Sequence, residues 1–256
     1  VVFKTVAPAD ADTISRALVG ASPGVFEVNS GTLTLSSGSS TFGGNINLTG
    51  GKVIVAGAET ESVSGPLGLG GTISFTGGTL GYSVNNIYDY SARFSAAAGQ
   101  AYSIDTGGQS VTFTNAAGLT GSGNTLTKLG NGTLTLAGGA STYSGLTTVS
   151  LGKLVLQSAK TGTGNITVAD GAALGVVTGG TQVTPSTLTV GTGASATLEF
   201  NSVSSTTTAP IAAGSIAAGG PITVNVNSGT LAPGNSYPLF SWSAGAAPEV
   251  SLGVLN

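Results

Sequence analysis

The stretch LTKLGNGTLTLAGGASTYSGLTTVSLGKLVL, residues 126–156, contains a short pattern that recurs down the chain. Its runs TLTL and KLVL place apolar residues at alternate positions, which is typical of strands with one buried face. Gly-rich segments separate the runs, and glycine tolerates the positive φ that tight corners need. This stretch therefore predicts short strands joined by sharp corners.

Equivalent apolar residues return at nearly constant steps along the following chain. One row consists of Leu134, Leu154, Leu174 and Leu198. A second row follows two positions later, at Leu136, Leu156, Val176 and Phe200. A third row is predicted at Leu129, Val149, Val168 and Val190. A near-constant period of this kind indicates a coil whose turns stack on one another.

We therefore expect an all-β fold, a parallel β-helix (β-solenoid) of about 20 residues per turn. Residues 1–256 are expected to form this single solenoid. A β-sandwich would join its strands by hairpins and would carry no fixed phase. Stacked turns place like side chains in ladders about 4.8 Å apart, so about twelve turns would form a rod of roughly 55–60 Å.

Three segments depart from the regular pattern. Residues 1–24 form either an N-terminal cap, with a short helix begun by an Asp, or an ordinary irregular turn. Residues 86–100 hold the densest aromatic and charged cluster, so we expect an insertion there. Residues 201–256 are expected to form looser C-terminal turns.

An internal repeat links the two halves of the chain. Residues 31–55 align without gaps to residues 132–156, and eleven of the 25 aligned positions are identical. Glycines mark corners in both copies, while Leu or Val is expected to point inward and Thr outward. A further step of the same period, from Val53 to Ile73, is expected to extend the first copy.

The composition narrows the classes of function. The chain has no Cys and no His, so disulfides, thiolate metal sites and the commonest general base are excluded. Its seven Lys and Arg are scattered and the net charge is −3, which argues against a nucleic-acid partner. No apolar run approaches the length of a transmembrane helix. Because the chain starts at Val1 and not Met, we expect a processed product or a section of a longer protein.

Residues 126–156 resemble the autotransporter-associated β-strand repeat, also called the passenger-associated repeat, of bacterial surface proteins. The positions that match its pattern are Leu126, Lys128, Gly130, Gly132, Thr133, Leu134, Leu136, Gly138, Tyr143, Gly145, Thr147, Val149, Gly152, Leu154 and Leu156. The copy at 31–55 departs from it, with Phe42 for the Tyr and Glu27 for the Lys. The resemblance implies a right-handed coil, exported and displayed outside a bacterial cell.

We therefore expect a non-catalytic extracellular structural protein without cofactor or metal, either a surface stalk or adhesin passenger or a subunit of a self-associating filament or matrix. The expected partners are the chain itself, through end-to-end or lateral association, or further repeats of a longer chain. The open ends of a coil are strand edges, which favours such docking.

A carbohydrate-binding adhesive module, with surface glycans as partners, is the alternative. Tyr82, Tyr88, Tyr90 and Tyr102, together with Phe94, surround the expected insertion and would form an aromatic patch. The competing interpretation is that some of these rings fill the core of a widened turn.

A polysaccharide-cleaving β-helix enzyme is a remote alternative, because such enzymes need clustered carboxylates. The ten acidic residues are spread along the chain. Two local pairs are predicted to be solvated loop charges, namely Asp10 with Asp12 and Glu59 with Glu61. Asp89 and Arg93 are predicted to form a surface ion pair, and Trp242 is predicted to be a packing residue.

Overall fold

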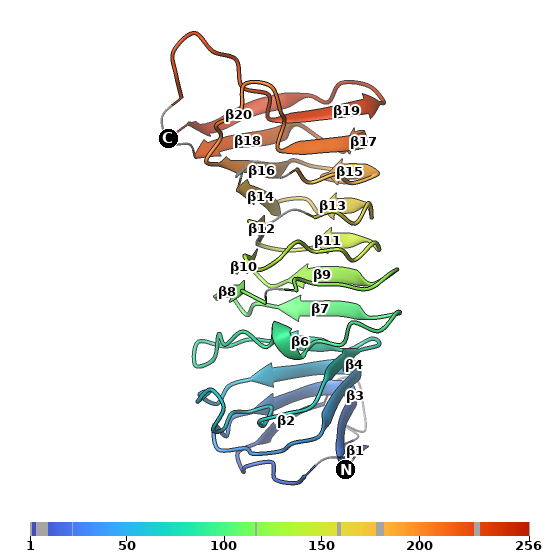
Figure 1. Cartoon of the computed structure of the whole chain (residues 1–256), viewed down its shortest axis with the longest axis vertical. Coiled ribbons are helices and arrows are strands. Elements are labelled where there is room, and N and C mark those ends of the chain that lie inside the picture. Colours follow the sequence, from blue (N-terminus) through green and yellow to red (C-terminus); the bar gives the residue numbers. More distant parts are fainter. Residues whose placement is uncertain are drawn as a thin grey trace.

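The computed structural model describes residues 2–3, 10–21, 23–115, 117–157, 160–177, 182–227 and 231–255. The chain coils into a rod, with its two ends at opposite ends of the long axis (Figure 1). Two parallel sheets run along this rod, one of 13 strands and one of seven. The all-β solenoid predicted from the sequence is confirmed.

The larger sheet contains the first strand of each turn. In order along the rod it consists of β1 (Val2–Phe3), β3 (Val25–Leu35), β4 (Asn45–Val55), β6 (Thr79–Gly81), β7 (Ala101–Asp105), β9 (Thr125–Leu129), β11 (Thr147–Val149), β13 (Ile166–Val168), β15 (Thr187–Val190), β17 (Ile211–Ala218) and β19 (Phe240–Ala244). Two shorter additions lie beside this path, β2 (Ala11–Ile14) on β3 and β5 (Ile73–Phe75) on β4.

The smaller sheet faces it across the core from residue 110 onward. Its strands, in sequence order, are β8 (Ser110–Phe113), β10 (Thr133–Leu136), β12 (Lys153–Leu156), β14 (Ala173–Val177), β16 (Ala196–Asn201), β18 (Ile222–Asn227) and β20 (Val250–Leu255). The described chain also has one short 3₁₀ turn, η1 (Ser91–Arg93). No helix in the described ranges is long and apolar enough to cross a membrane.

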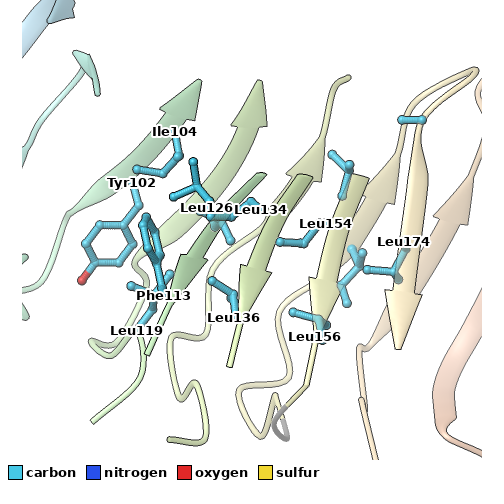
Figure 2. Close-up of a cluster of buried hydrophobic side chains, with 14 of the residues drawn as sticks. Tyr102, Ile104, Phe113, Leu119, Leu126, Leu134, Leu136, Leu154, Leu156 and Leu174 are labelled. Carbon is cyan, nitrogen blue, oxygen red and sulfur yellow. The ribbon is translucent and has the colours of Figure 1, made fainter. Parts of the chain in front are cut away.

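The predicted leucine row forms one ladder of the smaller sheet. Leu134 pairs with Leu154, Leu154 with Leu174, and Leu174 with Leu198. All four side chains are fully buried, and Figure 2 shows the first three projecting from successive strands into the interior. Burial of each such side chain contributes roughly 1.5–3 kcal/mol, so this ladder is a main source of stability.

The turns are longer than predicted in most of the rod. The pairing of Leu154 with Leu174 has the predicted step, but Val224 pairs with Leu252, which is a longer one. The described chain makes about 10 turns of ~24 residues, fewer than the expected number. The extra residues lie in corner loops between strands, which the period of the buried positions does not constrain.

The step predicted from Val53 to Ile73, after the first repeat copy, is wrong. Val53 pairs with Leu80, while Ile73 pairs with the first half of β4. The ladder through Val53 then continues to Ile104 in the larger sheet, whereas Leu154, the sequence counterpart of Val53, lies in the smaller one. The long loop between β4 and β5 therefore lengthens this turn, and the second halves of the two repeat copies lie in different sheets.

At the N-terminal end, residues 11–14 form a strand and not the start of a helix. This strand extends the ladder of β3, with Ile14 opposite Leu35.

Candidate functional site

Two loops meet at the predicted insertion and hold each other in place. Asn86 donates from its side-chain amide to the carbonyl of Gly57 at 2.8 Å and to the hydroxyl of Tyr90 at 3.0 Å. That hydroxyl in turn donates to a carboxylate oxygen of Glu59 at 2.5 Å. The loop after β4 and the segment 83–90 are thus joined by a buried polar chain, which fixes their geometry.

Most of the predicted aromatic patch is buried. Tyr82, Tyr90 and Tyr102 are at most 3% exposed, and Phe94 packs against the core. They fill the widened turn at the insertion, as in the competing interpretation. Tyr88 is half-buried and, of the four tyrosines, is the one that reaches the surface.

Tyr88 borders a shallow hollow of about 290 Å³ on the side of the rod. Its lining residues are Ala58, Glu59, Asn85, Asn86, Ile87 and Tyr88. The Tyr88 ring packs edge-on against Tyr90, with ring centroids 5.1 Å apart. Desolvation raises the pKa of Tyr88, and the carboxylates of Glu61 and Glu59 raise it further. The hollow therefore combines an aromatic edge, an amide and negative charge.

One of the four acids predicted to be solvated differs from that prediction. Glu59 is half-buried, and desolvation raises its pKa, opposed by the Tyr90 hydrogen bond and by the charge of Arg93. The other three, Asp10, Asp12 and Glu61, are exposed as predicted. Within the described ranges, no three acidic side chains gather closely enough to hold a metal ion.

The predicted ion pair between Asp89 and Arg93 does not form. Asp89 accepts hydrogen bonds from the backbone N–H groups of Ser91 and Thr114, at 2.8 and 2.5 Å. The Arg93 guanidinium instead donates to backbone carbonyls of one loop, those of Leu67, Gly68, Gly70 and Gly71. Burial lowers the pKa of Arg93. Its guanidinium carries five N–H donors, so it can satisfy several carbonyls of one loop at once.

The third predicted row is displaced by one residue at its first member. Lys128, not Leu129, pairs with Val149 and faces the interior. The side chain of Lys128 is fully buried, and its ammonium donates to the carbonyls of Leu129, Gly130 and Leu151 at 3.1, 2.7 and 3.0 Å. Burial lowers the pKa of Lys128 to about 8, opposed by the charge of Asp105. Strict alternation from Leu126 would have placed Lys128 inside, whereas the row predicted from the period began at Leu129.

A second interior lysine lies outside the two sheets, on a row of isolated parallel bridges along the coil. Lys160 is 1% exposed and forms isolated parallel bridges with Ser141 and Val183. Its ammonium donates to the carbonyl of Gly162 at 2.6 Å and lies 4.5 Å from the ring centroid of Tyr143. Burial lowers the pKa of Lys160 to about 8.

Two other lysines form ion pairs on the outer face of the coil. Lys52 lies 2.5 Å from Asp105, and Lys153 lies 2.9 Å from Glu199. These side chains remain partly exposed, so each pair contributes less than about 1 kcal/mol.

The last described turn leaves interior positions open. Val250 and Leu252 continue the buried ladder of β18 but are 46% and 71% exposed. On the other sheet, Trp242 stacks on Phe240 with ring centroids 5.9 Å apart, and both are half-buried. Trp242 is thus a packing residue as predicted. Within the described ranges, β19 and β20 are the last strands of their sheets and present strand edges.

Comparison with known families agrees with the repeat pattern. Residues 29–55 and 126–156 match the family model described as passenger-associated-transport-repeat. These segments contain the two repeat copies, so the resemblance to this repeat family is confirmed for them. No curated protein and no solved structure matches the chain.

Proposed function

We propose that the chain is a non-catalytic structural rod of an extracellular bacterial surface protein, a stalk or passenger segment whose role is reach and shape. The observation that carries this proposal is the parallel ladder that continues from β3 to β19 through every intervening turn. Each turn satisfies the backbone groups of its neighbours, which makes a stiff, extendable element. The two passenger-associated-transport-repeat segments support export and display outside the cell.

We further propose that rods join end to end through the open strand edges of β19 and β20. Val250 and Leu252 occupy inward-facing positions there, so another solenoid turn would continue the apolar ladder and pair the free edge. A second copy of the chain, or further repeats of a longer chain, is the partner that this surface is proposed to accept.

Sedimentation velocity over a range of concentrations tests this end-to-end association. We expect the unmodified chain to form species that lengthen with concentration, and a Val250→Asp plus Leu252→Asp variant to remain a single rod. Ser251→Asp adds a charge at an exposed position of the same strand and serves as the matched control. A chain that sediments as one species at all concentrations would remove self-association and leave the stalk segment as the function.

A carbohydrate-binding face is the second candidate, favoured by the hollow beside Tyr88. An accessible ring edge, the Asn85 amide and the Glu59 carboxylate are the kinds of group that contact sugar rings and hydroxyls. We expect glycan-array signals to fall in Tyr88→Ala and to persist in Tyr237→Ala, which removes another half-buried tyrosine. An array without signals for the unmodified chain would eliminate this candidate.

A further inference from the structure

The segments that lead into the two repeat copies place different aligned positions inside the coil. Before the first copy Val28 faces inward and pairs with Leu48, while Glu27 accepts a hydrogen bond from Thr49 at 3.1 Å. Before the second copy the residue aligned with Glu27 is Lys128, and Lys128 faces inward. The strand before the corner has therefore shifted by one residue between the two aligned segments.

The shift arises at the corner that follows the strand. The inward Leu33 lies five positions after the inward Val28, but Leu134 lies six positions after Lys128. Gly130 absorbs the difference with a φ of +76°, a conformation that glycine adopts without strain. A corner of the first kind would instead place Leu129 inside and Lys128 outside.

The strand β9 thus has two possible phases, which differ in which alternate residues face inward. Burial of apolar side chains does not by itself favour either phase. The observed phase of β9 buries Leu126 and Lys128. The alternative phase would bury Leu129 with Thr127, so each phase places one leucine in the core. Because a one-residue shift exchanges the two faces of a strand, some other interaction must select one of them.

The ammonium of Lys128 supplies that interaction. In the observed phase it reaches carbonyls on both sides of the corner, two of its own turn and that of Leu151 in the next turn. Buried carbonyls need a donor, and a charged donor makes the stronger bond. In the alternative phase Lys128 would point to solvent, and these bonds would be lost.

We propose that Lys128 is a register-determining residue, whose interior ammonium ties two consecutive turns and selects the phase of β9. Its role is specificity, at a cost in stability from burying a charge. Lys160 has a related arrangement on the row of isolated bridges, where its ammonium donates to the carbonyls of Gly162 and Tyr143 and lies over the Tyr143 ring.

Single-cysteine labelling tests the proposal directly, because the chain has no native cysteine. Leu126→Cys reports an inward position, and Thr127→Cys reports an outward one. Each is placed in the otherwise unmodified chain and in a Lys128→Thr background, where each phase buries one leucine and one threonine, so that apolar burial still favours neither phase and the ammonium is absent. Lys153→Thr is the matched control, since Lys153 forms an ion pair on the outer face.

We expect Lys128→Thr to remain a folded β-protein by circular dichroism but to lose its unique phase. The cysteine at 126 should then react with a thiol reagent about tenfold faster or more, and the cysteine at 127 should become slower. Lys153→Thr should change neither rate. Unchanged rates at both cysteines in Lys128→Thr would overturn the proposal, because the phase would be held without the ammonium. Complete unfolding of Lys128→Thr would also contradict it, since the ammonium would then support the fold and not its phase.

Discussion

Two buried lysines held by backbone carbonyls are the feature of single residues that most distinguishes this coil. The ammonium of Lys128 contacts the carbonyl of Gly130, and that of Lys160 contacts the carbonyl of Gly162 and an aromatic face. Burial of a charge is costly unless hydrogen bonds compensate for the lost hydration. The pKa of both lysines is lowered, because these hydrogen bonds compensate for only part of the desolvation cost.

These lysines predict stability that rises with pH. Their folded-state pKa of about 8 lies below the value of about 10.4 expected in the unfolded chain. Between those values the unfolded chain binds more protons, so the free energy of unfolding increases with pH. The urea midpoint should therefore rise from pH 8 to pH 10. Above pH 10 it should fall, because burial raises the pKa of Tyr90 and Tyr143 and only the unfolded chain then ionises them.

The control for this pH dependence is the paired removal of both interior charges. Lys128→Met combined with Lys160→Met should abolish the rise, whereas Lys153→Met should retain it. A rise of the same size in the double variant would assign it to other groups.

The inward leucines make a second prediction for single residues. Leu134→Asp places an unpaired charge in the fully buried ladder and should lower the free energy of unfolding by about 4 kcal/mol or more. Thr135→Asp, on the outward side of the same strand, should have a far smaller effect. Thermal melts followed by circular dichroism compare the two. Equal losses would mean that the inward and outward faces are misassigned.

The sequence predicts the inward or outward position of some of these residues better than that of others. The leucine row from Leu134 to Leu198 was predictable because alternation within strands and the period between turns agree. Lys128 was not, because both phases of its strand bury one leucine, and the deciding contacts are backbone carbonyls that composition does not reveal. The buried tyrosines of the insertion were ambiguous for a similar reason, since an aromatic ring suits a core or a binding face equally.

At the level of strands and corners, glycine sets where each turn bends. Gly152 has a φ of +64°, and a Cβ there would collide with the carbonyl of Gly132 in the preceding turn. Gly171 has a similar φ of +72° but open space around it. Substitutions at these two glycines therefore distinguish two costs. Gly171 reports the cost of a positive φ alone, and Gly152 reports that cost together with the cost of a steric clash with the stacked turn.

We expect Gly171→Ala to cost about 1–2 kcal/mol, the penalty for a side chain in the left-handed region. Gly152→Ala should cost a further ~1–3 kcal/mol, because the stacked turn must shift. Urea unfolding at one pH measures both. Equal costs would show that the turns at Gly152 can separate without penalty.

The insertion shows what a period cannot predict. Arg93 and Asp89 are close in sequence and of opposite charge, yet each binds backbone groups of a different loop. Loop carbonyls and N–H groups are positioned only by the tertiary fold, so local charge spacing predicted the wrong partners. The hollow beside Tyr88 depends on the same loops and was equally inaccessible to sequence reasoning.

Across the whole molecule, the stacking direction is the property on which the proposed function depends. A rod whose strands lie across its long axis is extendable, because each added turn pairs with the last one. The turn length varies from one part of the rod to another, but the parallel pairing does not, since corner loops absorb the extra residues. The predicted architecture therefore holds although the predicted number of turns was too high.

Diffraction from an aligned film or gel of the purified chain measures that direction most directly. We expect a sharp reflection at about 4.8 Å along the long axis of the rods, because turns stack in that direction. A reflection at this spacing perpendicular to the rod axis, or particles that do not align as rods, would contradict the stacked coil and with it the proposed structural role.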